Sequence, residues 1–392
     1  RYVSTVDSGN LVGYIWLVEE SIDEYMGYPL INKSLPLGLQ DTLKLAENEI
    51  YKELKVKQAY GDFIEKLSGD GLNKFQGEHI IDVFLLRTFL YELIKKSMEF
   101  DKKSVKLYWN MKIYNMCIKF LEELNNLFPC VAFVNENPQF KGFKNKVNDL
   151  AVKVPLGKIP EAVDKLIGEF SHQEENDSIN DLKELLLKTK FNIGKIIFQI
   201  KTIRDTLSSM AKEHNFSMLY NKKRQLFAIG YDVEKDTLGK NYYDLLASEA
   251  RQASFVAIAK GEVEQSHWFN LGRAMTSVGG GKGLVSWSGT MFEYLMPLII
   301  MKKFPDTLFS ETYEYIVEVQ KNYGDKKHIP WGISESAYYD FDINSIYQYK
   351  AFGVPGIGLK RGLTNELVVS PYASVMALQV DFKNAMDNIK KL

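Results

Sequence analysis

The 392-residue sequence has little of several features that mark common functional classes. Its two cysteines, Cys117 and Cys130, form no CxxC pair and have no histidine pattern nearby, which argues against a disulfide framework and against a zinc site. The five histidines include no HExxH motif and no i,i+4 pair, so the sequence predicts neither a metal nor another cofactor. We interpret the cysteines as small buried hydrophobic residues in a reducing compartment.

The sequence also lacks an excess of charge of either sign, because its 49 basic and 50 acidic residues give a formal net charge of -1. Such a chain has no overall field to attract nucleic acid or an anionic membrane, so a neutral polymer is the easier partner. The best apolar run, 294–301, is short and contains a proline, and no transmembrane helix is predicted. The chain starts at Arg1 without a signal-like stretch, and we expect it to be a piece of a longer protein.

Helical periodicity dominates what is present. Residues 40–130 hold three long patterns with apolar residues at three- and four-residue spacing and with Lys and Glu on the opposite face. Residues 178–214 predict one very long helix, or two helices that break near Gly194. Residues 224–238 predict a small β-ribbon. Because strands and helices do not alternate regularly, we predict a mainly α fold of helical hairpins, with residues 1–392 as one domain.

The first residues predict a short extended entry and then a helix, with Asp7 or Ser8 as its N-cap. In this interpretation Asp7 and Asn10 precede the helix as polar loop residues. Helix capping alone accounts for residues of this type and is favoured. The alternative is that both side chains face a cleft.

The segment 242–361 differs from the rest because Trp, Tyr, Phe, Gly, Ser and isolated carboxylates crowd together in it. Glu249 lies in a predicted helix, 242–261, among small residues that let another helix or a ligand approach closely. Its carboxylate either pairs with a cation such as Arg251 or Arg273, or is functional. The sequence alone favours the structural ion pair.

Two further glutamates of this segment are candidates. Glu335 follows Pro330 and Gly332, where a helix is not expected to continue, and a solubilising charge and a functional role are both open for it. Glu293 is predicted on a helix that begins at Ser288 or Thr290. A buried carboxylate there is either a structural anchor or a substrate ligand.

Two carboxylates that meet in a cleft with aromatic walls suit glycosidic chemistry. One group protonates the departing sugar oxygen, while the other attacks or activates an acceptor. A single aromatic residue is more often core than ligand, so the signal is their clustering beside Gly and Ser. The residues predicted to stack on sugar rings are Trp268, Trp287, Trp331, Tyr338, Tyr347 and Phe352. The glycine-rich stretch 279–283 lacks the spacing of a phosphate-binding loop and predicts a turn.

Several strings of the sequence resemble the cyclization (transglycosylation) domain of bacterial cyclic β-1,2-glucan synthases. They include RYVSTVDSGNL, YYDLLASEARQASFVAIAKG, SHWFNLGR, LVSWSGTMFEYLMPLII, PWGISESAYY, YQYKAFGVPGIGLKRGL and VVSPYASVMAL, and the likeness is most specific over 242–378. The resemblance implies an (α/α)6 toroid that is related in fold to bacterial β-1,2-glucanases. It also implies that the family's sequence continues on both sides of this chain.

The resemblance implies an anomer-retaining transglycosylation of linear β-1,2-glucan. The polymer is cleaved internally, a glycosyl-enzyme forms, and the chain's own non-reducing-end 2-hydroxyl attacks it and closes a ring. Matched motif by motif, Glu249 of LLASEAR falls on the nucleophile and Glu335 of WGISES on the acid/base. A retaining pair is expected to hold its carboxyl groups about 5 to 5.5 Å apart, with one pKa raised. The predicted substrate-binding residues also include Asp7, Asn10, His267, Arg273 and Glu293.

The resemblance also implies a setting. In those synthases this domain lies between a membrane-embedded glycosyltransferase and a phosphorylase-like carboxy-terminal region, which predicts a position at the cytoplasmic face of an inner-membrane synthase. One alternative function is an endo-β-1,2-glucanase that hydrolyses the same polymer on the same fold. Another is a non-catalytic module that holds glucan. A phosphorylase is weaker, because no phosphate site is visible in the sequence.

Overall fold

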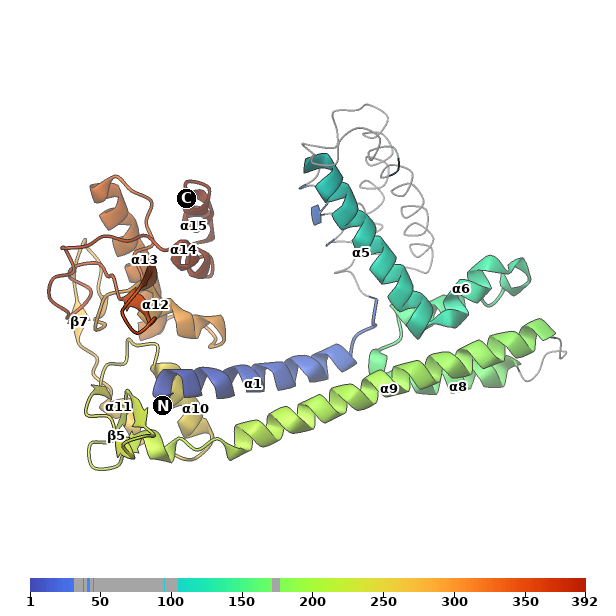
Figure 1. Cartoon of the computed structure of the whole chain (residues 1–392), viewed down its shortest axis with the longest axis horizontal. Coiled ribbons are helices and arrows are strands. Elements are labelled where there is room, and N and C mark those ends of the chain that lie inside the picture. Colours follow the sequence, from blue (N-terminus) through green and yellow to red (C-terminus); the bar gives the residue numbers. More distant parts are fainter. Residues whose placement is uncertain (32–37, 39–40, 43–44, 46–94, 96–104, 171–176) are drawn as a thin grey trace. The chain divides into compact units, whose positions relative to one another are not determined.

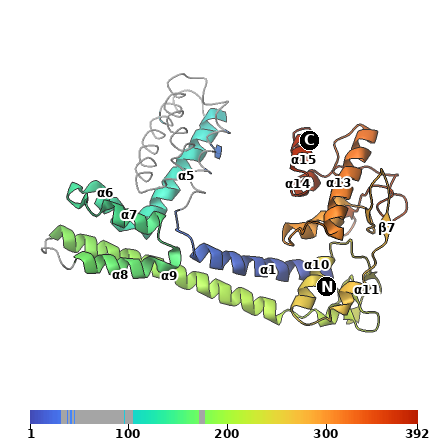
Figure 2. The ribbon, with the colours of Figure 1, turned by 180° about the vertical axis from the view of Figure 1, so that it is seen from behind.

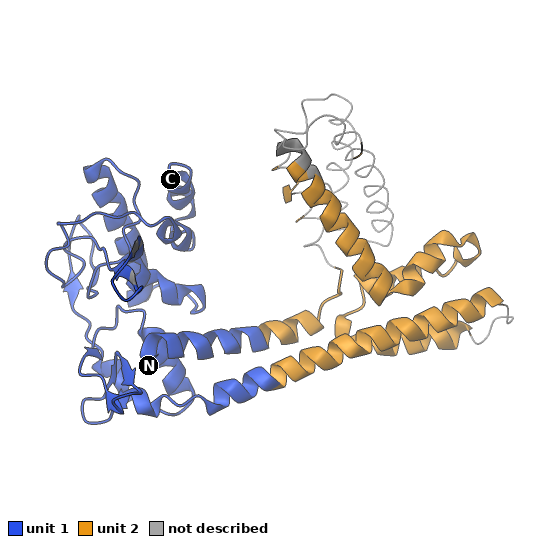
Figure 3. Cartoon of the chain, in the orientation of Figure 1, with its two compact units in different colours: residues 1–19, 206–392 blue, residues 20–205 orange. Residues whose placement is uncertain are grey.

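The computed structural model describes the chain except at residues 32–37, 39–40, 43–44, 46–94, 96–104 and 171–176 (Figure 1). Its contacts divide the chain into two compact units, one of residues 1–19 and 206–392 and the other of residues 20–205 (Figure 3). The single domain expected over the whole chain stays a prediction. Most of the helical patterns expected within 40–130 lie outside the described residues.

The unit of residues 20–205 is helical in its described part. Its helices are α5 (Val105–Leu127), α6 (Pro129–Glu136), α7 (Lys144–Val152), α8 (Ile159–Phe170) and most of α9 (Asp177–Glu213), with 3-10 turns at Pro138–Phe140 and Leu156–Lys158. Their apolar faces form one core around Phe128, Leu150, Leu156 and Leu182. The predicted burial of Cys117 and Cys130 is confirmed, and both are free thiols. Because α9 continues through Gly194, the single long helix is confirmed over the broken one.

The other unit starts with β1 (Tyr2–Ser4) and α1 (Thr5–Met26), and the last turns of α1 belong to the unit of residues 20–205. Its remaining helices are α10 (Arg251–Ala259), α11 (Ser266–Asn270), α12 (Met291–Leu295), α13 (Leu308–Lys327), α14 (Pro371–Ala377) and α15 (Phe382–Ile389), with 3-10 turns at Ser217–Leu219 and Met296–Ile299. One core lies around Leu284, Leu295, Ile316 and Ile333, and a second around Val12, Phe216, Phe227 and Val256.

The strands of this unit are short and antiparallel. They are β2 (Tyr220–Asn221), β3 (Leu226–Ala228), β4 (Gly230–Asp232), β5 (Thr237–Leu238), β6 (Tyr242–Tyr243), β7 (Met275–Thr276), β8 (Gly283–Leu284), β9 (Ser336–Phe341) and β10 (Tyr347–Lys350). They pair in the orders β1-β4-β5, β2-β3-β6, β7-β8 and β9-β10. The ribbon predicted over 224–238 is confirmed by the pairing of Tyr231 with Leu238. The turn predicted over 279–283 is confirmed, because this stretch connects β7 to β8.

Two predicted helix boundaries are wrong. The Ser4 hydroxyl accepts a hydrogen bond from the Asp7 backbone N–H at 3.3 Å, and the helix starts at Thr5, so Asp7 and Asn10 lie inside α1 instead of before it. The helix predicted over 242–261 begins only at Arg251, because Tyr243 pairs with Phe227 and holds the chain extended.

The small residues that surround Glu249 in the sequence serve helix packing. α1 and α10 lie side by side in both views (Figures 1 and 2). A Cβ atom added at Gly9 of α1 would come within 2.4 Å of the Ala253 Cβ in α10, so only glycine permits this approach. The expectation that another helix comes close to this segment is thereby confirmed.

Helices make up most of the described chain, which confirms the mainly α prediction. None of the described helices is both long enough and apolar enough to cross a membrane. Among the described residues no core cluster spans both units, and the candidate functional site lies entirely within residues 1–19 and 206–392.

Candidate functional site

Glu249 lies in a tight turn that connects β6 to α10. The Ser248 backbone N–H donates to the Leu246 carbonyl at 3.0 Å, and the Gln252 N–H donates to the Glu249 carbonyl at 3.2 Å. The Ser248 hydroxyl lies 3.1 Å from Glu249 Oε2 and donates to it. The turn thus fixes a half-buried carboxylate directly before the first turn of a helix.

The predicted ion pair of Glu249 with an arginine is wrong. Arg251 is 2% exposed and donates to the carbonyls of Ser248, Glu293 and Tyr294 at 2.5 to 2.9 Å. Arg273 donates to the carbonyls of Trp268, Phe269 and Leu271. Both guanidinium groups are therefore occupied by backbone oxygens. The structure thus favours the other alternative for Glu249, a functional role.

Glu335 lies in a loop that neighbouring helices pin to the core. The buried Gln320 side chain of α13 accepts from the Ile333 N–H at 2.8 Å and donates to the Ile333 carbonyl at 2.9 Å. The Tyr372 hydroxyl of α14 donates to the Glu335 carbonyl at 2.9 Å. The expected absence of a helix around Glu335 is confirmed, and the loop is nonetheless held at several backbone positions.

The five-residue helix α12 joins the two glutamate segments. On one side, the Glu293 and Tyr294 carbonyls accept from Arg251, which is anchored in the Glu249 turn. On the other side, the Met291 N–H donates to the Ile333 carbonyl at 3.2 Å, and the Phe292 N–H donates to the Ser334 hydroxyl at 3.0 Å. Since a helix rises about 1.5 Å per residue, these bonds keep the two glutamate segments close together.

Glu293 is the structural anchor of α12. Thr290 caps the helix, as one of the two predicted caps, and forms a capping box with Glu293. The Glu293 carboxylate also accepts from the Ser286 hydroxyl at 2.7 Å and from the Ser288 N–H at 2.9 Å. Because the carboxylate is buried and bonded on both oxygens, the structure favours the predicted anchor over a direct substrate ligand.

The pKa values of the two half-buried glutamates are raised. Burial, followed by the Glu293 charge, raises the pKa of Glu249 to about 7. Burial, followed by the Glu249 and Glu293 charges, raises the pKa of Glu335 to about 8, although Lys360 and the Thr290 hydroxyl act in the opposite direction. Near neutral pH Glu335 therefore keeps its proton more often than Glu249, a difference that suits general acid–base chemistry.

The raised pKa values predict a pH-dependent gain in stability for Glu335→Gln. A carboxyl group whose pKa is higher in the folded state than the unfolded value of about 4.3 stabilises the fold at low pH. That contribution is lost as the pH rises through the folded value of about 8. At pH 9 the variant should therefore melt about 2 °C or more above the wild type, and the difference should shrink towards pH 5 in calorimetry. A difference that does not change with pH would contradict the raised pKa.

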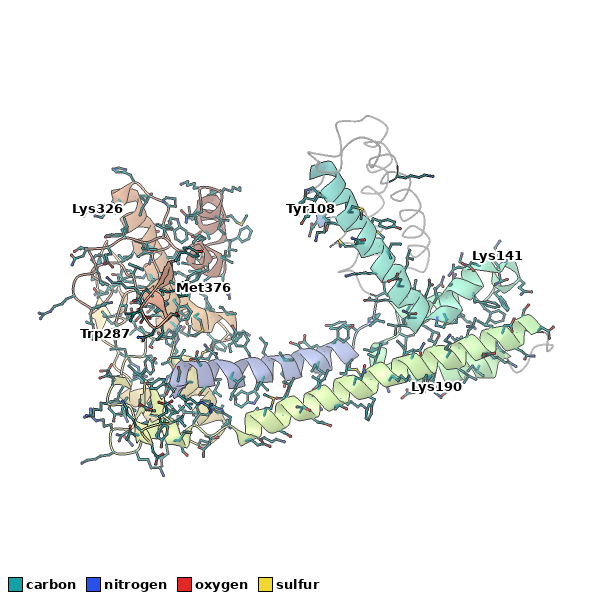
Figure 4. The ribbon with its side chains drawn as sticks, viewed as in Figure 1. Tyr108, Lys141, Lys190, Trp287, Lys326 and Met376 are labelled. Atoms are coloured by element: carbon teal, nitrogen blue, oxygen red, sulfur yellow. The ribbon has the colours of Figure 1, made fainter. Side chains whose placement is uncertain are left out.

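Trp287 and Lys360 extend this site at the surface. Ser286 and Gly358 form a parallel bridge, and the Lys360 N–H donates to the Trp287 carbonyl at 2.8 Å. Trp287 is 61% exposed and is labelled in Figure 4. Because the Lys360 charge also acts on Glu335, this cation lies on the Glu335 side of the site.

Two tyrosines at the site, Tyr243 and Tyr372, were not among the residues predicted from the sequence. Burial, followed by the charges of Glu249, Tyr2, Asp7 and Glu335, raises the pKa of Tyr243, so this phenol lies among three of the predicted carboxylates. The Tyr372 hydroxyl donates to the Glu335 carbonyl and is hydrogen-bonded to the Ser334 hydroxyl, and burial raises its pKa to about 12. Both tyrosines lie in motifs that carry the family resemblance, and this position could have identified them as site residues.

The structure disfavours three predicted substrate contacts, because their side chains are enclosed. His267 is 0% exposed, and its two ring nitrogens bond to the Gln225 carbonyl and the Ser254 hydroxyl. Trp331 and Phe352 are 6% and 3% exposed and belong to the core around α12 and α13. A ring that is packed on both faces cannot stack on a sugar.

The other predicted contacts differ in their placement. Asp7 is exposed, and Asn10 is half-buried and accepts from the Gln252 amide at 3.0 Å. Trp268 is half-buried against the core around α12 and α13. The side chains of Tyr338 and Tyr347 lie outside the described residues, although their backbones belong to β9 and β10. Within the described part of the chain, no cluster of three or more His, Cys, Asp or Glu residues could hold a metal ion.

Comparisons with known proteins place the chain beside proteins that are described as acting on glucans. A family model described as Glycoamylase, putative glucoamylase, matches residues 241–392, which contain Glu249 and Glu335. The chain is 43% identical over 396 aligned residues to Cyclic beta-(1,2)-glucan synthase NdvB of Rhizobium meliloti (strain 1021). That alignment covers 100% of this chain and 12% of the relative. The resemblance to cyclic β-1,2-glucan synthases is confirmed, and the chain spans only a small part of such a protein.

Proposed function

We propose that this chain, which is similar along its whole length to one part of a cyclic β-1,2-glucan synthase, converts linear β-1,2-glucan to cyclic β-1,2-glucan by anomer-retaining transglycosylation. Glu249 is the proposed nucleophile and Glu335 the proposed acid/base. The observation that carries the proposal is the pair of interacting carboxyl groups with raised pKa values, on two segments that both hydrogen-bond to α12.

The charge states near neutral pH suit this division of labour. Glu249 has the lower of the two raised pKa values and is the first to ionise, so it attacks the anomeric carbon. Glu335 keeps its proton longer and donates it to the departing 2-oxygen as the glycosidic bond breaks. The products of this half-reaction are a glycosyl ester on Glu249 and a released sugar chain with a new free hydroxyl.

The second half-reaction closes the ring. The 2-hydroxyl at the non-reducing end of the bound chain attacks the anomeric carbon, gives its proton to the Glu335 carboxylate, and displaces the Glu249 carboxylate. Two successive displacements leave the anomeric configuration unchanged. Cyclization requires that this hydroxyl reach the ester before water does, which a glucan chain held in position favours.

Direct attack by Glu249 suits a carboxyl separation of about 5 to 5.5 Å. A proton that passes from Glu335 through a substrate hydroxyl would relax this limit.

We further propose that an (α/α)6 toroid holds the site. We also propose that the full protein lies at the cytoplasmic face of an inner membrane, with glycosyltransferase and phosphorylase-like regions on the same polypeptide.

Incubation with linear β-1,2-glucan tests the proposed reaction. Ring formation yields products that resist an exo-β-glucosidase, and it creates no new reducing ends. Hydrolysis by an endo-β-1,2-glucanase, the second candidate function, instead raises the number of reducing ends in step with chain cleavage. A glucan-holding module without catalysis would bind the polymer and leave its length distribution unchanged. Mass spectrometry and a reducing-sugar assay on one reaction mixture separate the three outcomes.

The two pKa values predict a narrow bell-shaped dependence of turnover on pH. Activity should fall below about pH 7 as Glu249 becomes protonated and above about pH 8 as Glu335 loses its proton. Because bound substrate displaces water from both carboxyl groups, kcat/KM is the quantity that reports on the free protein. A profile that stays flat from about pH 5 to pH 10 would contradict acid–base roles for this pair.

A further inference from the structure

A shallow groove of about 350 Å³ runs along one side of α1, within the unit of residues 1–19 and 206–392. Asp7, Leu11, Tyr14 and Val18 line it at helical spacing, and Leu207 of α9 also lines it. The opposite side of α1 is occupied, because Gly9 and Gly13 lie against α10. The groove therefore follows the exposed stripe of a helix whose other face is packed.

The groove begins beside the Glu249 turn. Asn10, which lines it, accepts a hydrogen bond from the Gln252 side chain at 3.0 Å. The Gln252 backbone N–H in turn donates to the Glu249 carbonyl at 3.2 Å. Two hydrogen bonds thus connect a groove residue to the turn that carries the proposed nucleophile. The charges of Asp7 and Glu249 also both act on the Tyr243 phenol.

The chemistry of the lining selects the ligand class. The lining residues comprise one carboxylate, one amide, one phenol and several aliphatic side chains, and they contain no cation. Such a surface does not attract an anionic polymer. It suits an uncharged sugar chain, whose hydroxyl groups pair with Asp7 and Asn10 and whose apolar ring faces lie on Tyr14 and Leu11.

We infer that the α1 groove holds a stretch of β-1,2-glucan at some distance from the bond that is cleaved, with Tyr14 as the stacking platform and Asn10 as the polar contact next to the Glu249 turn. The inference rests on the proposed function, because it assigns the groove to the same polymer. A chain held here is bound over several sugar units, so long substrates gain more from the groove than short ones.

Binding to an inactive variant tests this inference. In the 392-residue chain with Glu335→Gln, calorimetry measures the affinity for a long linear β-1,2-glucan and for an oligosaccharide too short to reach both the groove and the carboxylates. Adding Tyr14→Ala should weaken binding of the long glucan about five- to tenfold, as expected for the loss of one aromatic platform. The short oligosaccharide should bind as before. Tyr14→Phe keeps the ring and should retain the affinity for the long glucan.

Phe382→Ala is the matched control, because this exposed aromatic residue at the start of α15 does not line the groove. It should leave both affinities unchanged, and melting temperatures of all variants establish that they fold. Equal affinity of Tyr14→Ala and its parent for the long glucan would overturn the inference, and so would an equal loss for both ligands. These outcomes are independent of whether the wild type forms rings, which is the test of the proposed function.

Discussion

Replacement of Glu249 or Glu335 by glutamine is expected to lower the turnover of linear β-1,2-glucan at least about 1,000-fold. Glutamine preserves the size of each side chain but neither attacks a sugar carbon nor transfers a proton. The local turns should persist, since they are held by backbone bonds and by Gln320, Arg251 and Tyr372. The measurement is the initial rate of ring formation, with chain cleavage followed in the same reaction.

Glu293→Gln is the matched control for this pair. Its carboxylate is buried in hydrogen bonds with Ser286, Ser288 and Thr290, so the expected result is a lower melting temperature and a smaller loss of turnover. Should Glu249→Gln or Glu335→Gln keep turnover within about tenfold of the wild type, that residue has no direct part in the chemistry.

Azide rescue distinguishes the two proposed roles. With an activated β-glucosyl substrate, azide that replaces a missing nucleophile gives the α-azide in one displacement. Azide that intercepts a glycosyl-enzyme when the acid/base is missing gives the β-azide. We expect the α product from Glu249→Ala and the β product from Glu335→Ala. The reverse pattern would exchange the roles and leave the dyad itself intact.

Replacement of Arg251 by methionine is expected to reduce the free energy of unfolding by about 3 to 5 kcal/mol. The substitution removes the donors for three buried carbonyl groups, and the Tyr313 hydroxyl also loses its partner at 3.3 Å. The guanidinium group lies over the Phe309 ring at 4.8 Å, so packing is lost as well. Chemical denaturation followed by tryptophan fluorescence measures the change.

Two variants frame the Arg251 result. Arg251→Lys retains the charge but cannot bond the Glu293 and Tyr294 carbonyls in the same geometry, so an intermediate loss is expected. Arg224→Met removes an exposed arginine that lies over the Tyr242 ring and should cost about 1 kcal/mol or less. If Arg251→Met were no more destabilising than Arg224→Met, α12 would not depend on this anchor.

The sequence by itself determined the local structure where one short-range preference acted alone. Apolar periodicity is sufficient for the long helix α9, and the aromatic run with its turn is sufficient for the ribbon formed by β4 and β5. Capping preferences limited the start of α12 to Ser288 or Thr290, of which the structure has Thr290. The motifs LLASEAR and WGISES also identified Glu249 and Glu335 as candidates. A motif shows which residue types are present, but it does not give the distance between the two carboxyl groups.

Only the tertiary structure decided which side chains are available at the site. Trp287 and Trp331 occur in similar surroundings in the sequence, yet the first is 61% exposed and the second 6%, because Asn388 and Gln320 pin the Trp331 loop to the core. Arg251 forms no ion pair with Glu249, since carbonyl groups more than 40 residues away use its donors. Burial and hydrogen-bond partners depend on contacts between distant segments, and no local pattern specifies them.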